Sequence, residues 1–188
     1  MLAPLLLAGA GAAHAQTPEP APRTHVAVLA GVFEVGDRVD QSAELGAQYR
    51  FGTRWWRLQP VAGGMAGADG AYTLYGGVAL DLPLGRHAYV RGTFAPGLYG
   101  PGSQGKDLGH TLQFRSGIET GWRSPTGWGL GLELYHLSNG RLGETNPGSN
   151  SLVVTLSIPV GGAGRNPEFS QYPDPRGGSR VASTVASR

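Results

Sequence analysis

A chain of 188 residues with a formal net charge of +2 and 15% charged residues offers no basic surface of the kind that nucleic-acid binding requires, and it has no cysteine for disulfides or thiolate metal sites. Its 32 glycines are too many for a soluble helical protein of this size, and its hydrophobic content of 40% is too high for a disordered chain. High glycine content with scattered aromatic residues is typical of short strands joined by turns, so we expect one all-β domain.

The N-terminal residues predict export. Residues 1–13 are a short apolar stretch, and the following His14 and Ala15 complete a small-x-small pattern that predicts cleavage of a signal peptide after Ala15. A membrane-anchoring helix is the alternative, but about 20 apolar residues are needed to span a bilayer. The positive residues that usually begin a signal peptide are missing, which leaves open whether translation starts upstream. Residues 16–23 are rich in proline and predict a linker.

From residue 24 to residue 160, short segments alternate between apolar and polar residues. We predict eight strands, at about 24–36, 41–52, 55–66, 71–83, 86–98, 109–122, 126–138 and 150–160. An even number of alternating segments of ~10 residues is the signature of a transmembrane barrel. An exported chain that resides in a membrane without a spanning helix must form a closed barrel. We therefore expect residues 24–160 to form an eight-stranded antiparallel transmembrane β-barrel in the bacterial outer membrane.

Charged residues of both signs lie on the polar faces of these strands. They are Glu44, Arg50, Arg57, Asp81, Arg91, Arg115, Glu119 and Glu133. The lumen of an eight-stranded barrel is just wide enough to hold side chains, so we expect these charges to pair inside it and to leave no wide pore. A soluble barrel of the lipocalin kind is the alternative, but its outward face should be rich in Lys and Glu, and this chain has a single lysine, Lys106.

Two further features lie at the edges of the predicted barrel. Four tryptophans, Trp55, Trp56, Trp122 and Trp128, lie near strand ends and are expected to form an interfacial girdle. After Val160 the alternation stops, and residues 161–188 are rich in Gly, Pro, Ser and Arg, which predicts a disordered C-terminal tail.

Polar residues interrupt the apolar face at the end of the seventh predicted strand. His136 and Ser138 continue the outward-facing set that includes Leu134, and counting back from Leu152 places Asn150 on the same face. If the N-terminus is periplasmic, as in ordinary outer-membrane barrels, these three side chains meet at the extracellular end, beside the outer leaflet. That leaflet consists of lipopolysaccharide, whose acyl chains are ester-linked.

At these residues the sequence resembles the lipid A 3-O-deacylases, a family of eight-stranded outer-membrane esterases. The matching residues are His136-Leu-Ser138-Asn139, the loop Asn146-Pro147-Gly148, and Phe114-Arg115-x-x-x-Glu119-x-Gly121-Trp122 on the sixth strand, and the resemblance spans about residues 24–160. It implies a Ser-His-Glu triad in which Ser138 is the nucleophile, His136 is the general base and Asn139 helps to hold the oxyanion. It also implies lipid A as the substrate, a 3-hydroxy fatty acid as the product, and no metal or cofactor.

The chain departs from this pattern at the position of the acid, where it has Asn150. An asparagine can orient His136 but offers no negative charge to the imidazolium. Three explanations stay open: Asn150 is a weaker orienting residue, Glu144 in the same loop replaces the acid, or the protein is an inactive homologue with a structural or lipopolysaccharide-binding role.

The sequence leaves other questions without an answer. His25, His87 and His110 are scattered and share no metal-ligand spacing, so we expect strand-end or lumen positions for them. Nothing in the sequence decides which acyl position is cleaved, which chain length is preferred, or whether the barrel forms a homodimer.

Overall fold

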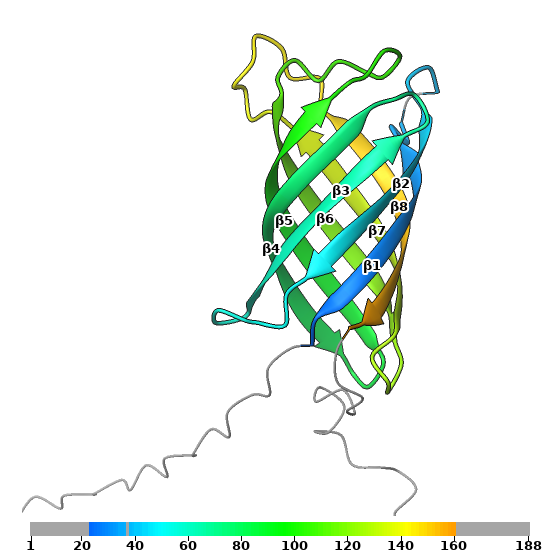
Figure 1. Cartoon of the computed structure of the whole chain (residues 1–188), viewed down its shortest axis with the longest axis vertical. Helices are drawn as coiled ribbons and strands as arrows, with labels where there is room; N and C mark the ends of the chain where they lie inside the picture. The colour runs from blue at the N-terminus through cyan, green and yellow to red at the C-terminus, as the bar shows by residue number, and fades with distance from the viewer. Residues whose placement is uncertain (1–22, 37, 161–188) are drawn as a thin grey trace, which may run out of the picture.

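The computed structural model of the chain describes residues 23–36 and 38–160. They form a closed barrel in which each strand pairs antiparallel with its neighbours in sequence and β1 pairs with β8 (Figure 1). The strands are β1 (His25–Phe33), β2 (Ser42–Arg50), β3 (Leu58–Gly67), β4 (Tyr72–Leu84), β5 (Ala88–Gly100), β6 (Leu112–Arg123), β7 (Gly129–Ser138) and β8 (Ser149–Pro159). The predicted eight-stranded antiparallel barrel is confirmed.

Some of the predicted segments lie outside the described residues. These are the signal peptide, the C-terminal tail and, except for Arg23, the proline-rich linker. No helix in the described part of the chain is long and apolar enough to cross a membrane.

The exterior of the barrel is apolar, and this face follows from the alternation within each strand. On β7, Leu130, Leu132 and Leu134 are 55%, 45% and 53% exposed, whereas the intervening Glu133 is buried. A belt of exposed leucine, valine and phenylalanine is what a barrel presents to lipid. The soluble alternative is excluded, because its apolar face would point inward.

Ion pairs fill the lower half of the lumen, near the start of β1. Glu119 accepts a hydrogen bond from Arg50 at 3.0 Å and contacts Arg91 at 3.3 Å. Asp81 pairs with Arg91 and, at 3.0 Å, with Arg123. Buried charges are costly unless they are paired, so these contacts explain how the interior tolerates them.

A second charged pair lies in the middle of the lumen. Arg115 donates a hydrogen bond to Glu133 at 2.8 Å and lies between the rings of Tyr75 and Tyr135, 4.8 and 3.9 Å from their centroids. The predicted lumenal pairing is therefore correct for all but two of the eight residues. Glu44 lies in the lumen, but there it accepts a hydrogen bond from the hydroxyl of Tyr135 at 2.6 Å in place of an ion pair. Arg57 was expected on a polar strand face, but it lies exposed in the connection before β3, because that strand begins one residue later.

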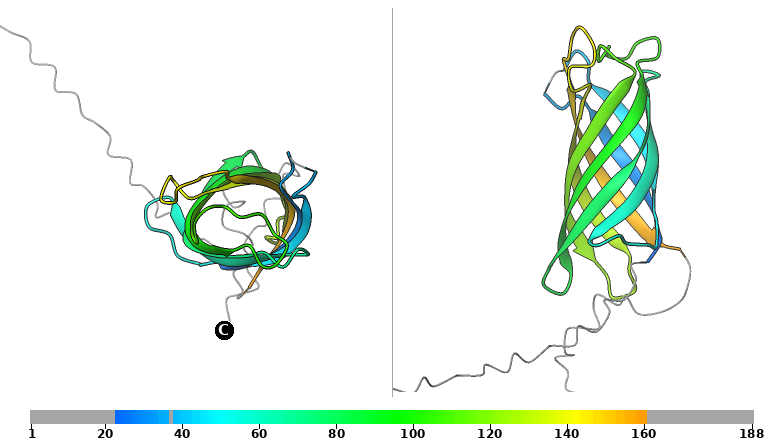
Figure 2. Two further views of the ribbon diagram at one scale, coloured as in Figure 1. Left: turned by 90° about the horizontal axis from the view of Figure 1, so that it is seen from above. Right: turned by 90° about the vertical axis from the view of Figure 1, so that its left-hand side faces the viewer.

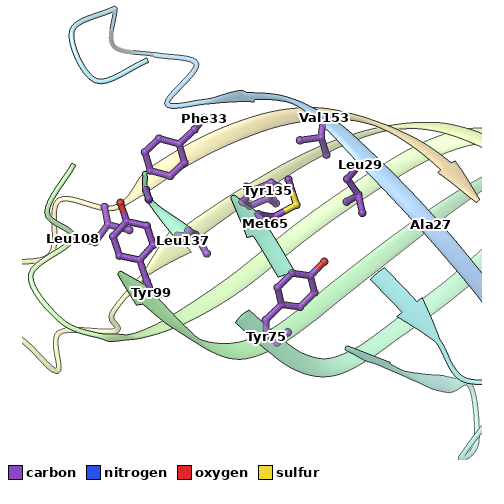
Figure 3. Packing of buried hydrophobic residues seen from close by; sticks show 12 residues of the cluster. Ala27, Leu29, Phe33, Met65, Tyr75, Tyr99, Leu108, Tyr135, Leu137 and Val153 are labelled. Carbon is purple, nitrogen blue, oxygen red and sulfur yellow. The ribbon is translucent and has the colours of Figure 1, made fainter. Parts of the chain in front are cut away.

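The other end of the lumen is filled by apolar side chains (Figure 3). The rings of Phe33 and Tyr99 stack at 6.3 Å, and Leu108, from the β5–β6 loop, is buried beside Leu137 of β7. Seen from above, part of this loop lies across the opening of the barrel (Figure 2). These packed side chains thus hold β7 in place from inside the barrel, at the level where His136 and Ser138 lie on its outer face.

The two ends of the barrel differ. The long connections 101–111 and 139–148 lie together at the top of Figure 1, which we call the loop end, and we call the opposite end the turn end. All four tryptophans lie at the turn end, on the β2–β3 connection and on both sides of the β6–β7 turn, and each is at least 50% exposed. The predicted girdle of tryptophans is therefore present at the turn end and does not extend to the loop end in the described part of the chain.

Candidate active site

His136 and Asn150 form the centre of the candidate site. The register of β7 and β8 places them directly opposite each other, and both side chains point to the exterior at the loop end. His136 Nδ1 lies 3.0 Å from Asn150 Oδ1. Since the amide oxygen can only accept, Nδ1 carries the hydrogen of this bond, and in a neutral imidazole the lone pair is then on Nε2. The structure therefore brings together these two residues, as the strand parity predicted.

Ser138 is the last residue of β7, on the same face as His136. The intervening Leu137 and the preceding Tyr135 point into the lumen and are 1% and 2% exposed, so the segment that carries both polar residues is anchored from inside. Among the described residues, no hydrogen bond joins the Ser138 hydroxyl to His136. Such contacts are often long in hydrolases without substrate and shorten when the substrate binds.

Gly148 forms the wall behind the imidazole. Its φ of 64° lies in the left-handed region, and a β-carbon at this position would lie 2.9 Å from Cε1 and 3.2 Å from Nε2 of His136. Both its backbone conformation and its contact with the ring require glycine. The Asn-Pro-Gly turn in the sequence was the available signal for this position.

Asn139 holds the β7–β8 loop together from inside. Its side chain is fully buried, and its amide nitrogen donates to the carbonyl oxygens of Leu108 at 2.9 Å and Thr145 at 2.7 Å. Its oxygen accepts from the backbone N–H of Arg141 at 2.9 Å. Both amide hydrogens are thus used, and the predicted contact of this side chain with an oxyanion does not fit the geometry.

Glu144 lies on the exposed side of the same loop. In the part of the chain that the structure describes, no hydrogen bond or ion pair joins it to His136, whose Nδ1 is bonded to Asn150. The prediction of Glu144 as a substitute acid therefore does not fit this arrangement, in which the residue hydrogen-bonded to the imidazole is Asn150.

Ser116 and a groove are the parts of the site that the sequence did not indicate. Ser116 of β6 lies directly opposite His136 on the other side from Asn150, with its side chain outward. A groove of about 490 Å³ begins at these three residues and continues over the outer wall. Finding either feature requires the register between strands, which a single sequence does not reveal.

The other histidines in the described part of the chain have structural positions. His110 Nδ1 accepts a hydrogen bond from the backbone N–H of Leu112 at 3.0 Å, just before β6. His25 contacts the carbonyl oxygens of Arg23 and Gly127 at 2.9 and 3.2 Å, and His87 contacts that of Arg123 at 3.0 Å. Within the described ranges, no group of three or more His, Cys, Asp or Glu residues could hold a metal ion.

Comparison with known proteins identifies a family and similar folds. The model of a family described as lipid A 3-O-deacylase (PagL) matches residues 38–159, which include β2 to β8 and the whole candidate site. Among solved structures, the chain is similar to the outer membrane enzyme PagL, with 19% identity, a TM-score of 0.59 and coverage of 72% of this chain and 99% of that one. It is also similar to Neisserial surface protein A (NspA), with 12% identity, a TM-score of 0.50 and coverage of 73% and 97%. No curated protein matches the chain significantly.

Proposed function

Because the chain belongs to the lipid A 3-O-deacylase family, we propose that it is a serine esterase that hydrolyses an ester-linked 3-hydroxyacyl chain of lipid A. It is an outer-membrane β-barrel, and its family consists of ester hydrolases. The observation that supports activity best is the hydrogen bond of 3.0 Å between His136 and Asn150 on the lipid-facing wall, two residues from Ser138.

The position of the site matches the substrate. Outer-membrane barrels have short periplasmic turns and longer extracellular loops, so the loop end faces outward. His136, Ser138 and Asn150 then lie at the level of the outer leaflet, where lipopolysaccharide resides. An ester in that leaflet reaches the site by lateral movement, without entering the lumen.

The proposed reaction is acyl transfer through Ser138. Nε2 of His136 takes the hydroxyl proton while Ser138 Oγ attacks the ester carbonyl, and the tetrahedral intermediate collapses when His136 returns the proton to the departing sugar oxygen. Water, activated by the same imidazole, then hydrolyses the acyl-serine to the free fatty acid. Asn150 keeps the hydrogen on Nδ1 so that Nε2 serves as the base in both halves.

Donors for the oxyanion must come from groups other than the Asn139 side chain. The backbone N–H of Asn139 donates to Asn146 Oδ1 at 3.0 Å, which fixes the orientation of the exposed Asn146 amide and leaves its NH₂ group as a donor. We assign the oxyanion to this amide together with the backbone N–H of Gly140. Asn139 then acts as a positioning residue, because it holds the loop that carries both donors.

One observation favours a second candidate function. Asn150 offers no negative charge to the imidazolium, and loss of that charge in a serine protease lowered turnover by about ten-thousand-fold. A catalytically inactive barrel with a structural or lipopolysaccharide-binding role is therefore the alternative.

Mass spectrometry of lipid A separates the two. Cells that carry ester-linked acyl chains on lipid A would express the full-length chain, Ser138→Ala or Ser116→Ala, beside an empty vector. With the unchanged protein we expect lipid A to lose one hydroxyacyl chain, which is released as the free acid. With Ser138→Ala we expect no such loss, and with Ser116→Ala we expect hydrolysis to be retained. Activity lost only with Ser116→Ala would move the nucleophile to β6. Intact lipid A with every variant would overturn the enzyme and leave the non-catalytic role.

A further inference from the structure

The hairpin between β2 and β3 has a tryptophan in a strained backbone conformation at its tip. Trp55 and Leu58 exchange both backbone hydrogen bonds at 3.0 Å, so Trp56 and Arg57 are the central residues of a tight turn. The φ of Trp56 is 57°, whereas Arg57 lies outside the left-handed region. A positive φ at the first central position alone defines a type II′ turn, and that position usually holds glycine. A bulky residue there is an outlier that costs backbone energy.

Packing within the barrel does not explain this tryptophan. Trp55 and Trp56 are 82% and 78% exposed, and in the part of the chain that the structure describes neither indole has a ring or hydrogen-bond partner. The hairpin stands out from the wall at the lower left of Figure 1, and it projects in the same direction when the barrel is seen from above (Figure 2). A strained residue that packs against nothing in its own fold indicates a contact outside the chain.

An arginine lies beside exposed aromatic rings in two neighbouring hairpins of the turn end. Arg57 follows Trp56 at the tip of the β2–β3 hairpin. In the β4–β5 hairpin, Arg86 precedes His87, whose ring stacks on that of Trp122 at 5.7 Å. The two hairpins are neighbours on the rim because β3 pairs with β4. Both arginines are exposed, and within the described ranges no oxygen atom accepts a hydrogen bond from either guanidinium.

The two ends of the barrel differ in charge. The β2–β3, β4–β5 and β6–β7 connections contain arginine but no aspartate or glutamate. Asp81 and Glu119 lie near this end, but both point into the lumen, where they pair with Arg91. Acidic residues outnumber basic ones at the loop end, where the described charged residues of the connections are Glu34, Arg38, Asp40, Asp69, Lys106, Asp107, Arg141 and Glu144. The exterior of the turn end is therefore a cationic rim that also carries aromatic rings.

This rim lies at the level of phospholipid headgroups. Since the loop end faces outward, the turn end lies at the periplasmic face, whose leaflet consists of phospholipid. The apolar wall ends here, because the exposed Leu82 and Leu84 come directly before the hairpin that carries Arg86. Indole rings favour the boundary between hydrocarbon and headgroups, and the planar guanidinium group matches the oxygens of a phosphate.

We propose that the β2–β3 and β4–β5 hairpins bind the headgroup of an anionic phospholipid of the periplasmic leaflet. Arg57 and Arg86 contact its phosphate, while Trp56 and Trp122 lie among the glycerol and the upper part of the acyl chains. A headgroup with a net negative charge is favoured over a zwitterionic one, whose ammonium group the same rim repels. This site lies at the opposite end of the barrel from His136 and does not depend on the esterase function.

The chain's own tryptophans report on this end of the barrel, because all four of them lie there. The purified full-length chain would be refolded into phosphatidylcholine vesicles with increasing fractions of brominated phosphatidylglycerol or, in parallel, of brominated phosphatidylcholine. Bromine quenches tryptophan fluorescence on contact, so the two titrations give the relative binding constant of the anionic lipid. An arginine near a membrane surface contributes roughly a fivefold preference, or about 1 kcal/mol. We therefore expect the unchanged protein to prefer phosphatidylglycerol by roughly 5- to 25-fold.

Neutral substitutions assign this preference to residues. We expect Arg57→Gln and Arg86→Gln each to lower it by up to about fivefold, and the double variant to bind both lipids equally. Arg38→Gln is the matched control, because Arg38 is an exposed arginine at the loop end, and it should keep the preference of the unchanged protein. The electrophoretic mobility of unheated and heated samples shows that each variant is folded.

Several results would overturn the site. These are equal quenching by both lipids in the unchanged protein, a preference that persists in the double variant, or a loss with Arg38→Gln as large as that with the double variant. Pelleting of the protein with purified peptidoglycan, abolished in the double variant, would assign the rim to the cell wall in place of lipid. Ester hydrolysis is measured separately and tests a different proposal.

Trp56→Gly tests the part played by the indole. Glycine relieves the left-handed backbone, and this change alone should stabilise the barrel. We nevertheless expect the urea midpoint of unfolding from vesicles that contain phosphatidylglycerol to fall, because the contact of the indole with lipid is lost. A midpoint that stays the same or rises would show that Trp56 gains nothing from the membrane and would remove it from the site.

Discussion

Replacing Asn150 by glutamate is expected to raise the rate of ester hydrolysis. In the transition state His136 becomes an imidazolium, and Asn150 Oδ1, 3.0 Å from Nδ1, contributes only the partial charge of an amide oxygen. A glutamate in the same position on β8 offers a full negative charge. An amide can also rotate to present its NH₂ group to Nδ1, which favours the wrong tautomer, whereas a carboxylate can only accept a hydrogen bond.

The size of the gain follows from the location of the pair. Two unit charges at ~4 Å interact by about 1 kcal/mol in water and about 4 kcal/mol at an effective dielectric constant of 20. Asn150 is exposed, and the proposed orientation of the barrel places it at the level of the membrane surface, so a value between these limits applies. About 1–3 kcal/mol of transition-state stabilisation corresponds to a rate increase of roughly 5- to 150-fold.

Steady-state hydrolysis of p-nitrophenyl esters by the purified protein measures this gain, and mass spectrometry of lipid A from expressing cells measures it on the natural lipid. Asn150→Gln is the matched control, because it has the size of glutamate without the charge. Asn150→Ala removes the acceptor and is expected to lower kcat below that of the parent chain.

Two results would refute the reasoning. If Asn150→Glu and Asn150→Gln hydrolyse esters at the same rate, the missing charge does not limit catalysis. If Asn150→Ala is as active as the parent chain, the hydrogen bond to His136 does not position the base, and the residue that does so must be sought elsewhere in the β7–β8 loop.

Four other changes have defined outcomes. Gly148→Ala is expected to lower kcat by roughly ten- to a hundred-fold in a barrel that still folds, because the added β-carbon would press on the ring of His136. An unchanged kcat would contradict that contact. Arg115→Leu is expected to reduce the free energy of unfolding in urea titrations by about 3–5 kcal/mol, because it leaves Glu133 buried without its partner. Adding Glu133→Leu should recover much of the loss, and a double variant no more stable than the single one would argue against this cause. Asn139→Ala is expected to lower the free energy of unfolding by about 1–3 kcal/mol and to speed proteolysis within residues 139–148, because the loop loses the hydrogen bonds of this side chain. Cleavage at the rate of the unchanged protein would show that these hydrogen bonds do not hold the loop. Chelation with EDTA is expected to leave hydrolysis unchanged, and a loss that added divalent metal restores would reveal a metal site.

Most of the fold was predictable because each strand has two different environments. Glu133 and Leu134 are neighbours in sequence, and a barrel in lipid can satisfy both only by placing the first in the lumen and the second outside. The same parity placed His136 and Asn150 on the exterior, where the structure has them.

The contacts that depend on register or on distant loops were not predictable. Ser116 lies beside His136 only because β6 and β7 pair in one particular register. The buried position of Asn139 depends on Leu108, which is far away in the sequence and enters the lumen from another loop. Arg57 was assigned to a strand face because the tight turn that contains it, closed by the bridge between Trp55 and Leu58, carries no glycine or proline that would mark the boundary.

β7 connects the interior of the barrel to the site on its exterior. Glu133 and Tyr135 point inward, where both contact Arg115, while His136 and Ser138 point outward from the same stretch of backbone. A slip of one residue in the pairing of β7 would exchange the two sets, placing an ionised carboxylate in lipid and the imidazole in the lumen. The ion pair of Glu133 is satisfied in one register only, so the buried contacts of Arg115 fix where the histidine and serine meet the outer leaflet. Arg115 touches neither of them, yet the position of the site on the wall depends on it.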